Sequence, residues 1–242
     1  HGNIRSPILK FFKKFLTSTI SFFVSFFCKL EKNEEVIISS AVYCPWKDDF
    51  KFSLFYKKIE NTTLLDLPRS YTLWSAARDL KKYNADILDL GCLQGGSGFI
   101  MAKQNINGKV LMFDTFQSFY QNDGLHTKKT FLFEDIGKVK KNIKKLRLKN
   151  TYVFKSRFPE NLKIKINKIK LCHFDVNVYS ETKKCFEFVN KRIIKGGIMV
   201  FDDYGIWGVN GIKKFISYVN KKYSKNFIFI KNYMGQCILI KR

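Results

Sequence analysis

Three aspartates follow two short apolar runs: Asp175 comes after residues 171–174, and Asp202 and Asp203 come after residues 198–201. Runs of this kind are typical of buried parallel strands, whose carboxyl ends meet at one edge of a sheet. Carboxylates gathered there raise one another's pKa unless a cation neutralises them. Oxygen ligands without Cys or His suit Mg²⁺, and a bound cation lowers the pKa of a coordinated hydroxyl. The alternative is that Asp202 and Asp203 cap a loop and Asp175 bonds the backbone.

A glycine-rich stretch, residues 85–98, precedes these acids in the chain. Its apolar run ends at Asp89 and its glycines lead into an apolar segment, which predicts a strand, a tight loop and a helix. Leu93 stands where a dinucleotide fingerprint needs its second glycine, and the Gly-Lys-Ser/Thr of a phosphate loop is absent. The remaining pattern, Asp-x-Gly-x-x-x-Gly-Gly, resembles the first motif of class I S-adenosylmethionine (SAM) methyltransferases, although plain turns also use such loops. The candidate cofactor-binding residues in this stretch are Asp89, Gly91, Gly95, Gly96 and Ser97.

Three further candidates follow the next two predicted strands. Asp114 ends the second strand, where a carboxylate can accept both ribose hydroxyls of an adenosine, or can simply cap a turn. We expect Phe116 to lie against the adenine ring and Ser156 to reach the adenine edge. Aromatic residues just past the later strands are candidates for the wall of an acceptor pocket. They are Tyr179, Tyr204 and Trp207.

These residues need a parallel sheet to position them. Strands are predicted over residues 87–89, 110–114, 151–155, 171–175 and 198–203, and helices over 66–83, 134–148, 180–194 and 212–223. Residues 226–230 and 237–240 flank a turn at Gly235, which indicates a terminal hairpin. We therefore expect an α/β fold of the class I methyltransferase, Rossmann-like type. It is a doubly wound, mostly parallel seven-stranded sheet with a terminal antiparallel hairpin and an N-terminal helical extension.

The N-terminal segment is unusually rich in phenylalanine. Its apolar residues follow a roughly helical spacing, with Lys10, Lys13 and Lys14 among them. The charge-free part is shorter than the roughly 20 residues that span a bilayer, and no signal-peptide cleavage site follows it. We favour a helix that packs on the domain or on a second subunit in a homodimer. The alternative is an interfacial helix over residues 8–28 that touches anionic lipid. The expected domains are 1–58, a Phe-rich helix and cap segment, and 59–242, a SAM-dependent methyltransferase domain.

Charge and cysteine content add weaker evidence. The net charge of +24 would suit nucleic acid, membrane or acidic substrates, but lysines occur in most segments and form no single basic arm. We therefore favour a compositional origin and expect no nucleic-acid partner. Six cysteines without a Cys-x-x-Cys pair or metal-ligand spacing fit a reducing cytosol. A cytoplasmic protein, with membrane association as the alternative, is the expectation.

Four motifs in order resemble the macrocin O-methyltransferase family. They are Asp-Leu-Gly-Cys-Leu-Gln-Gly-Gly-Ser (89–97), Phe-Asp-Thr-Phe-Gln-Ser-Phe (113–119), His-Phe-Asp-Val-Asn-Val-Tyr (173–179) and Gly-Gly-Ile-Met-Val-Phe-Asp-Asp-Tyr-Gly (196–205). That family methylates sugar hydroxyls of natural products with SAM and Mg²⁺. The resemblance, over about residues 60–242, implies an O-methyltransferase acting on a sugar or related polyol.

The same resemblance implies roles for single residues. It implies metal ligation by Asp175, Asp202 and Asp203, with Asp175 also the proton acceptor. It implies SAM contacts at residues 89–97 and at Asp114. Asn177 stands where the family's His-x-Asp-x-Asp-x-Tyr pattern has its second acid, which puts the affinity for metal or substrate in question.

Two other functions remain open from the sequence. A nucleic-acid methyltransferase would use the basic surface, although the Asp/Asn-Pro-Pro-Tyr motif of amino-methylating enzymes is absent. A non-catalytic SAM-binding scaffold at a membrane would explain Asn177. The expected partner of the leading hypothesis is a small-molecule or glycan acceptor.

Overall fold

The structure is a computed structural model that describes residues 7–27, 36, 43–117, 135–160, 162–206 and 209–242, with side chains from residue 15 onward. The chain divides into two compact units, His1–Cys44 and Pro45–Arg242. The first unit holds helix α1 (Pro7–Phe27), and the second begins with the short helix α2 (Pro45–Asp48). Helix α3 (Phe50–Ile59) lies in the second unit, where the ring of Phe52 packs 5.5 Å from that of Trp74.

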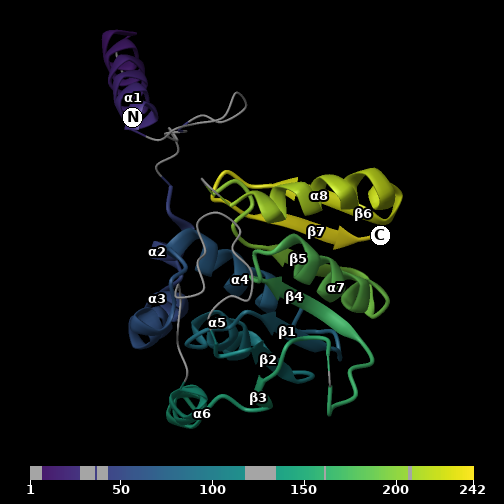
Figure 1. Cartoon of the computed structure of the whole chain (residues 1–242). Helices are drawn as coiled ribbons and strands as arrows, with labels where there is room; N and C mark the ends of the chain where they lie inside the picture. The colour runs from purple at the N-terminus through teal and green to yellow at the C-terminus, as the bar shows by residue number, and fades with distance from the viewer. Residues whose placement is uncertain (1–6, 28–35, 37–42, 118–134, 161, 207–208) are drawn as a thin grey trace. The chain divides into compact units, whose positions relative to one another are not determined.

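The described residues of the second unit form a seven-stranded sheet in the order β3-β2-β1-β4-β5-β7-β6 (Figure 1). The strands are β1 (Asp86–Leu90), β2 (Val110–Asp114), β3 (Thr151–Lys155), β4 (Ile169–Phe174), β5 (Ile193–Phe201), β6 (Phe227–Lys231) and β7 (Cys237–Lys241). Strands β1 to β5 are parallel, and β7 is antiparallel to both of its neighbours. The predicted fold class, a mostly parallel Rossmann-like sheet with a terminal hairpin, is confirmed.

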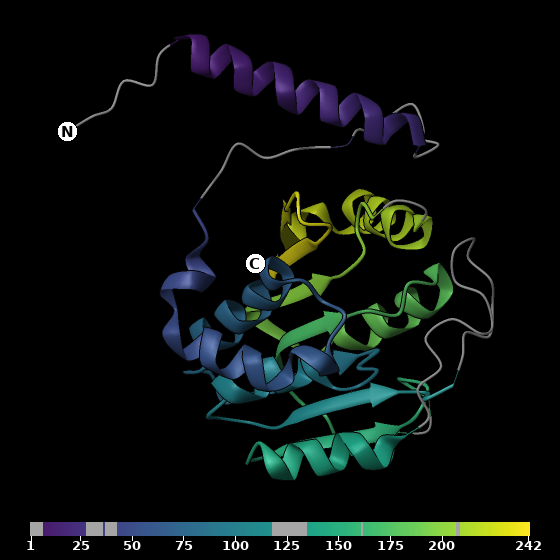
Figure 2. The same ribbon diagram turned by 90° about the vertical axis from the view of Figure 1, so that its left-hand side faces the viewer.

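Helices cover both faces of the sheet (Figure 1, Figure 2). They are α4 (Leu67–Asp79), α5 (Gly96–Gln104), α6 (Ile136–Lys145), α7 (Tyr179–Asn190) and α8 (Asn210–Tyr223). One apolar cluster joins α3, α4 and α5 to the sheet around Phe52 and Phe99. A second cluster joins α7 and α8 to the sheet around Phe186 and Phe215. Because neighbouring strand residues alternate between the two clusters, both faces of the sheet are buried against apolar side chains.

Three predicted helices end earlier in the structure than expected, and one of them is α6, which ends at Lys145 and not at residue 148. The prediction of a helix to residue 194 is wrong past Asn190, because Ile193 already pairs with Ile169 in the sheet. A branched pair such as Ile193-Ile194 suits a pleated strand better than a helix end. Helix α4 begins as predicted, since the Asp66 side chain accepts from the backbone N–H of Arg69 at 2.9 Å, but it ends at Asp79.

One lysine is buried inside strand β4. Lys170 is fully buried, and its Nζ donates to the carbonyl oxygens of Tyr83 at 2.9 Å and Asn107 at 2.6 Å. These bonds join the loops that precede β1 and β2 at the amino ends of the strands. Burial lowers the pKa of Lys170 to about 8, against the opposing effect of Asp86.

We expect Phe52→Ala to lower the free energy of unfolding by about 3–5 kcal/mol, because it leaves a cavity between α3 and α4. Phe50, on the same helix, is 70% exposed, and Phe50→Ala is the matched control with an expected change under about 0.5 kcal/mol. Urea denaturation followed by circular dichroism measures both changes. Equal losses would contradict the placement of α3 in the core.

We expect Lys170 to make stability depend on pH. Its folded pKa of about 8 lies below its ordinary value of 10.5, so the folded state is penalised while the lysine is charged. The penalty is complete below about pH 8 and is relieved as the pH rises toward 10.5. Wild-type protein should therefore gain stability over this window relative to Lys170→Met, measured by urea unfolding at each pH. If the stabilities of wild-type protein and Lys170→Met change equally with pH, Lys170 is hydrated in the folded protein.

Candidate functional site

The three predicted acids lie at the carboxyl ends of neighbouring parallel strands. Phe174 and Phe201, the last residues of β4 and β5, are register partners, so Asp175 and Asp202 leave the sheet side by side. The backbone N–H of Asp202 donates to the carbonyl of Phe174 at 2.9 Å. The N–H of Asp175 donates in turn to the carbonyl of Leu90 at the end of β1, at 2.8 Å. The carboxyl ends of the neighbouring strands β1, β4 and β5 thus lie side by side.

Asp175 interacts electrostatically with both other acids. Burial raises the pKa of the Asp175 carboxyl well above its ordinary value, and the charges of Asp202 and then Asp203 raise it further. The charge of His173 acts in the opposite direction. A carboxyl with a raised pKa is a better proton acceptor than an ordinary aspartate.

Arg69, in the first turn of α4, binds two of these acids. Its Nη1 lies 2.7 Å from Asp202 Oδ2 and 3.4 Å from Asp203 Oδ1. Its Nε lies 3.2 Å from Asp66 Oδ2, the carboxylate that caps the helix. Burial opposes the charge of Arg69, but the attraction of Asp202, Asp66 and Asp203 outweighs it and raises the arginine's pKa. Sequence reasoning missed this residue, because a single arginine at a helix start carries no signal of its distant partners.

Gln236 completes the hydrogen bonding of Asp202. It is fully buried in the turn between β6 and β7, and its Nε2 donates to Asp202 Oδ1 at 2.9 Å. Each carboxylate oxygen of Asp202 therefore has a partner from a different part of the chain. The terminal hairpin contributes a side chain to the site, and this contribution could not be predicted from a turn motif alone.

The carboxylate oxygens of the three acids have the chemistry of ligands for a divalent cation, but those of Asp202 and Asp203 bind the guanidinium of Arg69. Asp175, Asp202 and Asp203 offer the hard ligands that Mg²⁺ prefers. Asn177 Oδ1, on a neighbouring loop, is buried without a hydrogen-bond partner. Within the part of the chain that is described, however, no group of three or more His, Cys, Asp or Glu side chains has a geometry ready to hold a metal. Arg69 supplies the positive charge at Asp202 and Asp203.

The glycine loop lies directly against the backbone of Asp175. Gly91 has a φ of +88°, and a Cβ there would overlap the carbonyl oxygen of Asp175. Gly95 caps α5 with a φ of +96°, and a Cβ on Gly96 would meet the backbone carbonyl of Thr62. The loop that leads into α5 therefore begins against the backbone of Asp175, and the first N–H groups of α5 have no partner within the helix.

Asp89 and Ser97 bind other residues of the chain. Asp89 is fully buried, and its Oδ2 accepts from Ser97 Oγ at 2.8 Å. Its Oδ1 lies 2.8 Å from Nδ1 of His173, the residue opposite it on β4. Burial opposes protonation of His173, but its hydrogen bond with Asp89 and their charge attraction raise its pKa to about 9. This buried pair ties β1 to β4 beneath the loop.

Asp114 is held by the turn that follows β2. Its Oδ2 accepts from the N–H of Leu93 at 2.8 Å, and its Oδ1 accepts from the N–H of Phe116 at 2.7 Å. Burial raises the pKa of Asp114, and the hydrogen bonds from Phe116 and Leu93 oppose the rise. A backbone hydrogen bond from Thr115 also acts on this carboxylate. Since a carboxylate has about four acceptor positions, it keeps accepting capacity for ribose.

The remaining candidates lie around this turn or outside it. Ser156 lies beside Asp114, donating its N–H to the Asp114 carbonyl at 2.9 Å, while its Oγ donates to the Glu160 carbonyl. Phe116 is only 1% exposed and packs into the apolar cluster under α3 and α5. Tyr179 packs against Phe215, and Tyr204 is half-buried. Trp207 lies outside the described residues.

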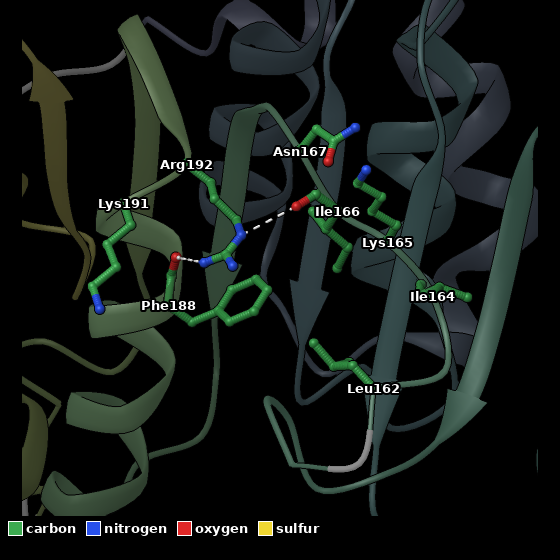
Figure 3. Close-up of a pocket in the computed structure, with 8 residues that line it drawn as sticks. All are labelled: Leu162, Ile164, Lys165, Ile166, Asn167, Phe188, Lys191 and Arg192. Atoms are coloured by element: carbon green, nitrogen blue, oxygen red, sulfur yellow. Dashed lines mark hydrogen bonds between the residues drawn. The ribbon is translucent and has the colours of Figure 1, made fainter.

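A cavity of about 530 Å³ lies elsewhere, at the amino ends of β4 and β5 (Figure 3). Arg192 crosses it, donating to the carbonyls of Ile166 and Phe188 and lying 3.7 Å from the Phe188 ring centroid. Its other lining residues are Leu162, Ile164, Lys165, Asn167 and Lys191. Because the acids lie at the opposite ends of the same strands, this cavity is not part of the site.

We expect Gly91→Ala to destabilise the protein more than Gly205→Ala. Both glycines have a positive φ, which costs an alanine about 1–2 kcal/mol, but a Cβ on Gly205 meets nothing within 4 Å. At Gly91 the overlap with Asp175 should add about 1–3 kcal/mol as the strands move apart. Thermal unfolding of both variants measures the difference. Equal losses would show that the approach of the loop to Asp175 is not tight.

Comparisons with known proteins identify the family. Residues 75–226, which contain the glycine loop and all three acids, match the model of the macrocin-O-methyltransferase (TylF) family. The fold is similar to that of the O-methyltransferase NovP (TM-score 0.66, 16% identity, covering 74% of this chain and 82% of that chain). It is also similar to an rRNA methylase from Streptococcus thermophilus (TM-score 0.52, 13% identity, 74% and 99% covered) and to CalS11, a calicheamicin methyltransferase (TM-score 0.52, 13% identity, 84% and 99% covered).

At these identities the solved structures show the fold alone. No curated protein matches the sequence of this chain. The family model, in contrast, spans more than half of the chain, from the middle of α4 to the end of the helical region before β6. The chain therefore belongs to the macrocin-O-methyltransferase (TylF) family of SAM-dependent O-methyltransferases.

Proposed function

We propose that this methyltransferase transfers the methyl group of SAM to a hydroxyl of a sugar or related polyol, with a divalent cation held by Asp175, Asp202 and Asp203. The observation that carries the proposal is the contact between the glycine loop and Asp175. Because Gly91 lies against the Asp175 backbone, the acid cluster stands beside the loop that the family uses for its methyl donor. The choice of a sugar acceptor rests on the family resemblance.

The chain's own residues would hold SAM along the edge of the sheet. The loop from Asp89 to Ser97 would bring backbone N–H groups to the donor, and Asp114 would accept the ribose hydroxyls. Ser156, whose N–H donates to the Asp114 carbonyl, would reach the adenine edge. Phe116 is only 1% exposed, so it would contact adenine if the turn that holds it moves.

Asp175 would act as the proton acceptor. As the bond from sulfur to methyl breaks and the bond from oxygen to methyl forms, the proton of the acceptor hydroxyl passes to the Asp175 carboxylate. A divalent cation at these carboxylates would supply positive charge that lowers the pKa of the acceptor hydroxyl.

Arg69 and a cation would compete for the same two carboxylates. The guanidinium contacts Asp202 Oδ2 and Asp203 Oδ1. We infer that binding a cation through both acids requires Arg69 to withdraw toward Asp66. Arg69 would then keep the acids neutralised before the cation is bound.

We expect Asp202→Asn to lose divalent-cation binding while Asp135→Asn keeps it. Asp135 is the matched control because it is no proposed ligand and caps α6 by accepting from the N–H of Lys138 at 3.0 Å, and asparagine is as good a helix cap as aspartate. Calorimetric titration with Mg²⁺ measures binding, and transfer from labelled SAM in EDTA measures the need for it. We expect EDTA to abolish transfer and excess Mg²⁺ to restore it. Full activity in EDTA would refute the role of the cation.

The acceptor class is tested by the same transfer assay on different substrates. We expect methylation of glycosides and cell-surface glycan precursors and none of RNA or DNA. Methylation of nucleic acid, with binding that weakens steeply with salt, would instead assign the basic surface to a nucleic-acid acceptor. SAM binding without Mg²⁺ binding and without methyl transfer would favour the alternative of a non-catalytic SAM-binding scaffold.

A further inference from the structure

Helix α1 has one narrow polar strip, and apolar residues dominate the rest of its surface. Positions 10, 14, 21 and 25 follow one another at spacings of four and seven, so they share one face of the helix. In the part of α1 whose side chains are described, the strip is formed by Thr17, Ser18, Ser21 and Ser25, and positions 10 and 14 of the same face are lysines in the sequence. The rest of α1 is dominated by Phe, Leu, Ile and Val. This is the distribution of a helix that lies at a boundary between water and an apolar phase.

The apolar side chains described on α1 are exposed. Phe22, Phe26 and Phe27 are exposed by 70%, 77% and 80%. Their described ring contacts are with one another, as in the edge-to-face pair of Phe26 and Phe27 at 5.6 Å. Exposed apolar surface of this extent marks a site of interaction.

Three hydroxyl groups of α1 have hydrogen-bond partners within its own unit. Thr19 Oγ1 donates to the Phe15 carbonyl at 2.9 Å, and Ser25 Oγ donates to the Ser21 carbonyl at 2.7 Å. Ser21 Oγ donates to the Val36 carbonyl at 2.6 Å. A hydroxyl that already has a partner costs little when the helix enters an apolar surface.

The charge of α1 indicates what covers it. Three lysines, at positions 10, 13 and 14, lie in its N-terminal half, and the helix contains no acidic residue. The whole chain carries a net charge of +24, which adds to the attraction toward an anionic surface. Among the described residues no helix is long and apolar enough to cross a membrane. These features fit a helix that lies in the plane of an anionic membrane surface.

We propose that α1 is an interfacial anchor that binds anionic lipid bilayers. The phenylalanine-rich face enters the boundary between headgroups and acyl chains, and the lysines contact the lipid phosphates. This inference is independent of the proposed acceptor and cation, since α1 belongs to a different unit from the site.

Vesicle flotation of the full chain tests the anchor. The probes are vesicles of phosphatidylcholine alone and of phosphatidylcholine with roughly a third of phosphatidylglycerol. We expect binding to the anionic vesicles and weak binding to the neutral ones. The combined change Lys10→Gln, Lys13→Gln and Lys14→Gln should weaken binding to anionic vesicles about a hundredfold. Phe22→Ser with Phe26→Ser should weaken it at least about tenfold, whereas Ser18→Gln, on the polar strip, should leave it unchanged.

Two further measurements keep the proposal falsifiable. SAM binding by each variant shows that the second unit is intact. Light scattering across a range of protein concentrations reports self-association. The proposal would be overturned by absence of vesicle binding or by equal binding to both kinds of vesicle. It would also be overturned if the protein is a dimer that dissociates on the phenylalanine changes and on no others, and this result would assign α1 to a second copy of this chain.

Discussion

Three carboxylates placed at the ends of two adjacent strands require a positive charge close by, and this requirement shapes the edge of the sheet. Without one, burial and mutual repulsion would favour protonation of the acids. Arg69 provides the charge for Asp202 and Asp203, while Asp175 keeps a raised pKa. Removing one partner of such a buried pair leaves an uncompensated charge, which is more costly than never burying the pair. The acids and Arg69 therefore form one unit in any account of this site.

Backbone contacts fix the glycine loop and the three acids to each other. Gly91 touches the Asp175 carbonyl, and the Asp175 N–H donates to Leu90. Below them, the buried pair of Asp89 and His173 joins β1 to β4. The glycine loop and Asp175 are thereby held by main-chain atoms, which move less than side chains. Methyl transfer benefits from such rigidity because reacting atoms must approach in line.

Much of the fold was predictable because its signals are local. Apolar runs ending in acids marked the strands, and the Asp66 cap followed by a proline marked the start of α4. Parallel strand ends share an edge, so the convergence of Asp175 with Asp202 followed from topology. Arg69 and Gln236 could not be predicted, since each meets Asp202 only through tertiary packing. The end of α7 was misplaced because the pairing of Ile193 with Ile169 outweighed its helical context.

The place of β7 in the sheet has a consequence for how the site is made during synthesis. Strand β6 leaves the ribosome before β7, yet among the described residues it pairs with β7, and β7 in turn pairs with β5. A nascent chain that stops before the turn between them therefore lacks the Gln236 amide that binds Asp202. The hydrogen bonding of Asp202 is in this way completed only when β7 joins the sheet, so a stalled or truncated chain would carry the glycine loop without a finished acid cluster.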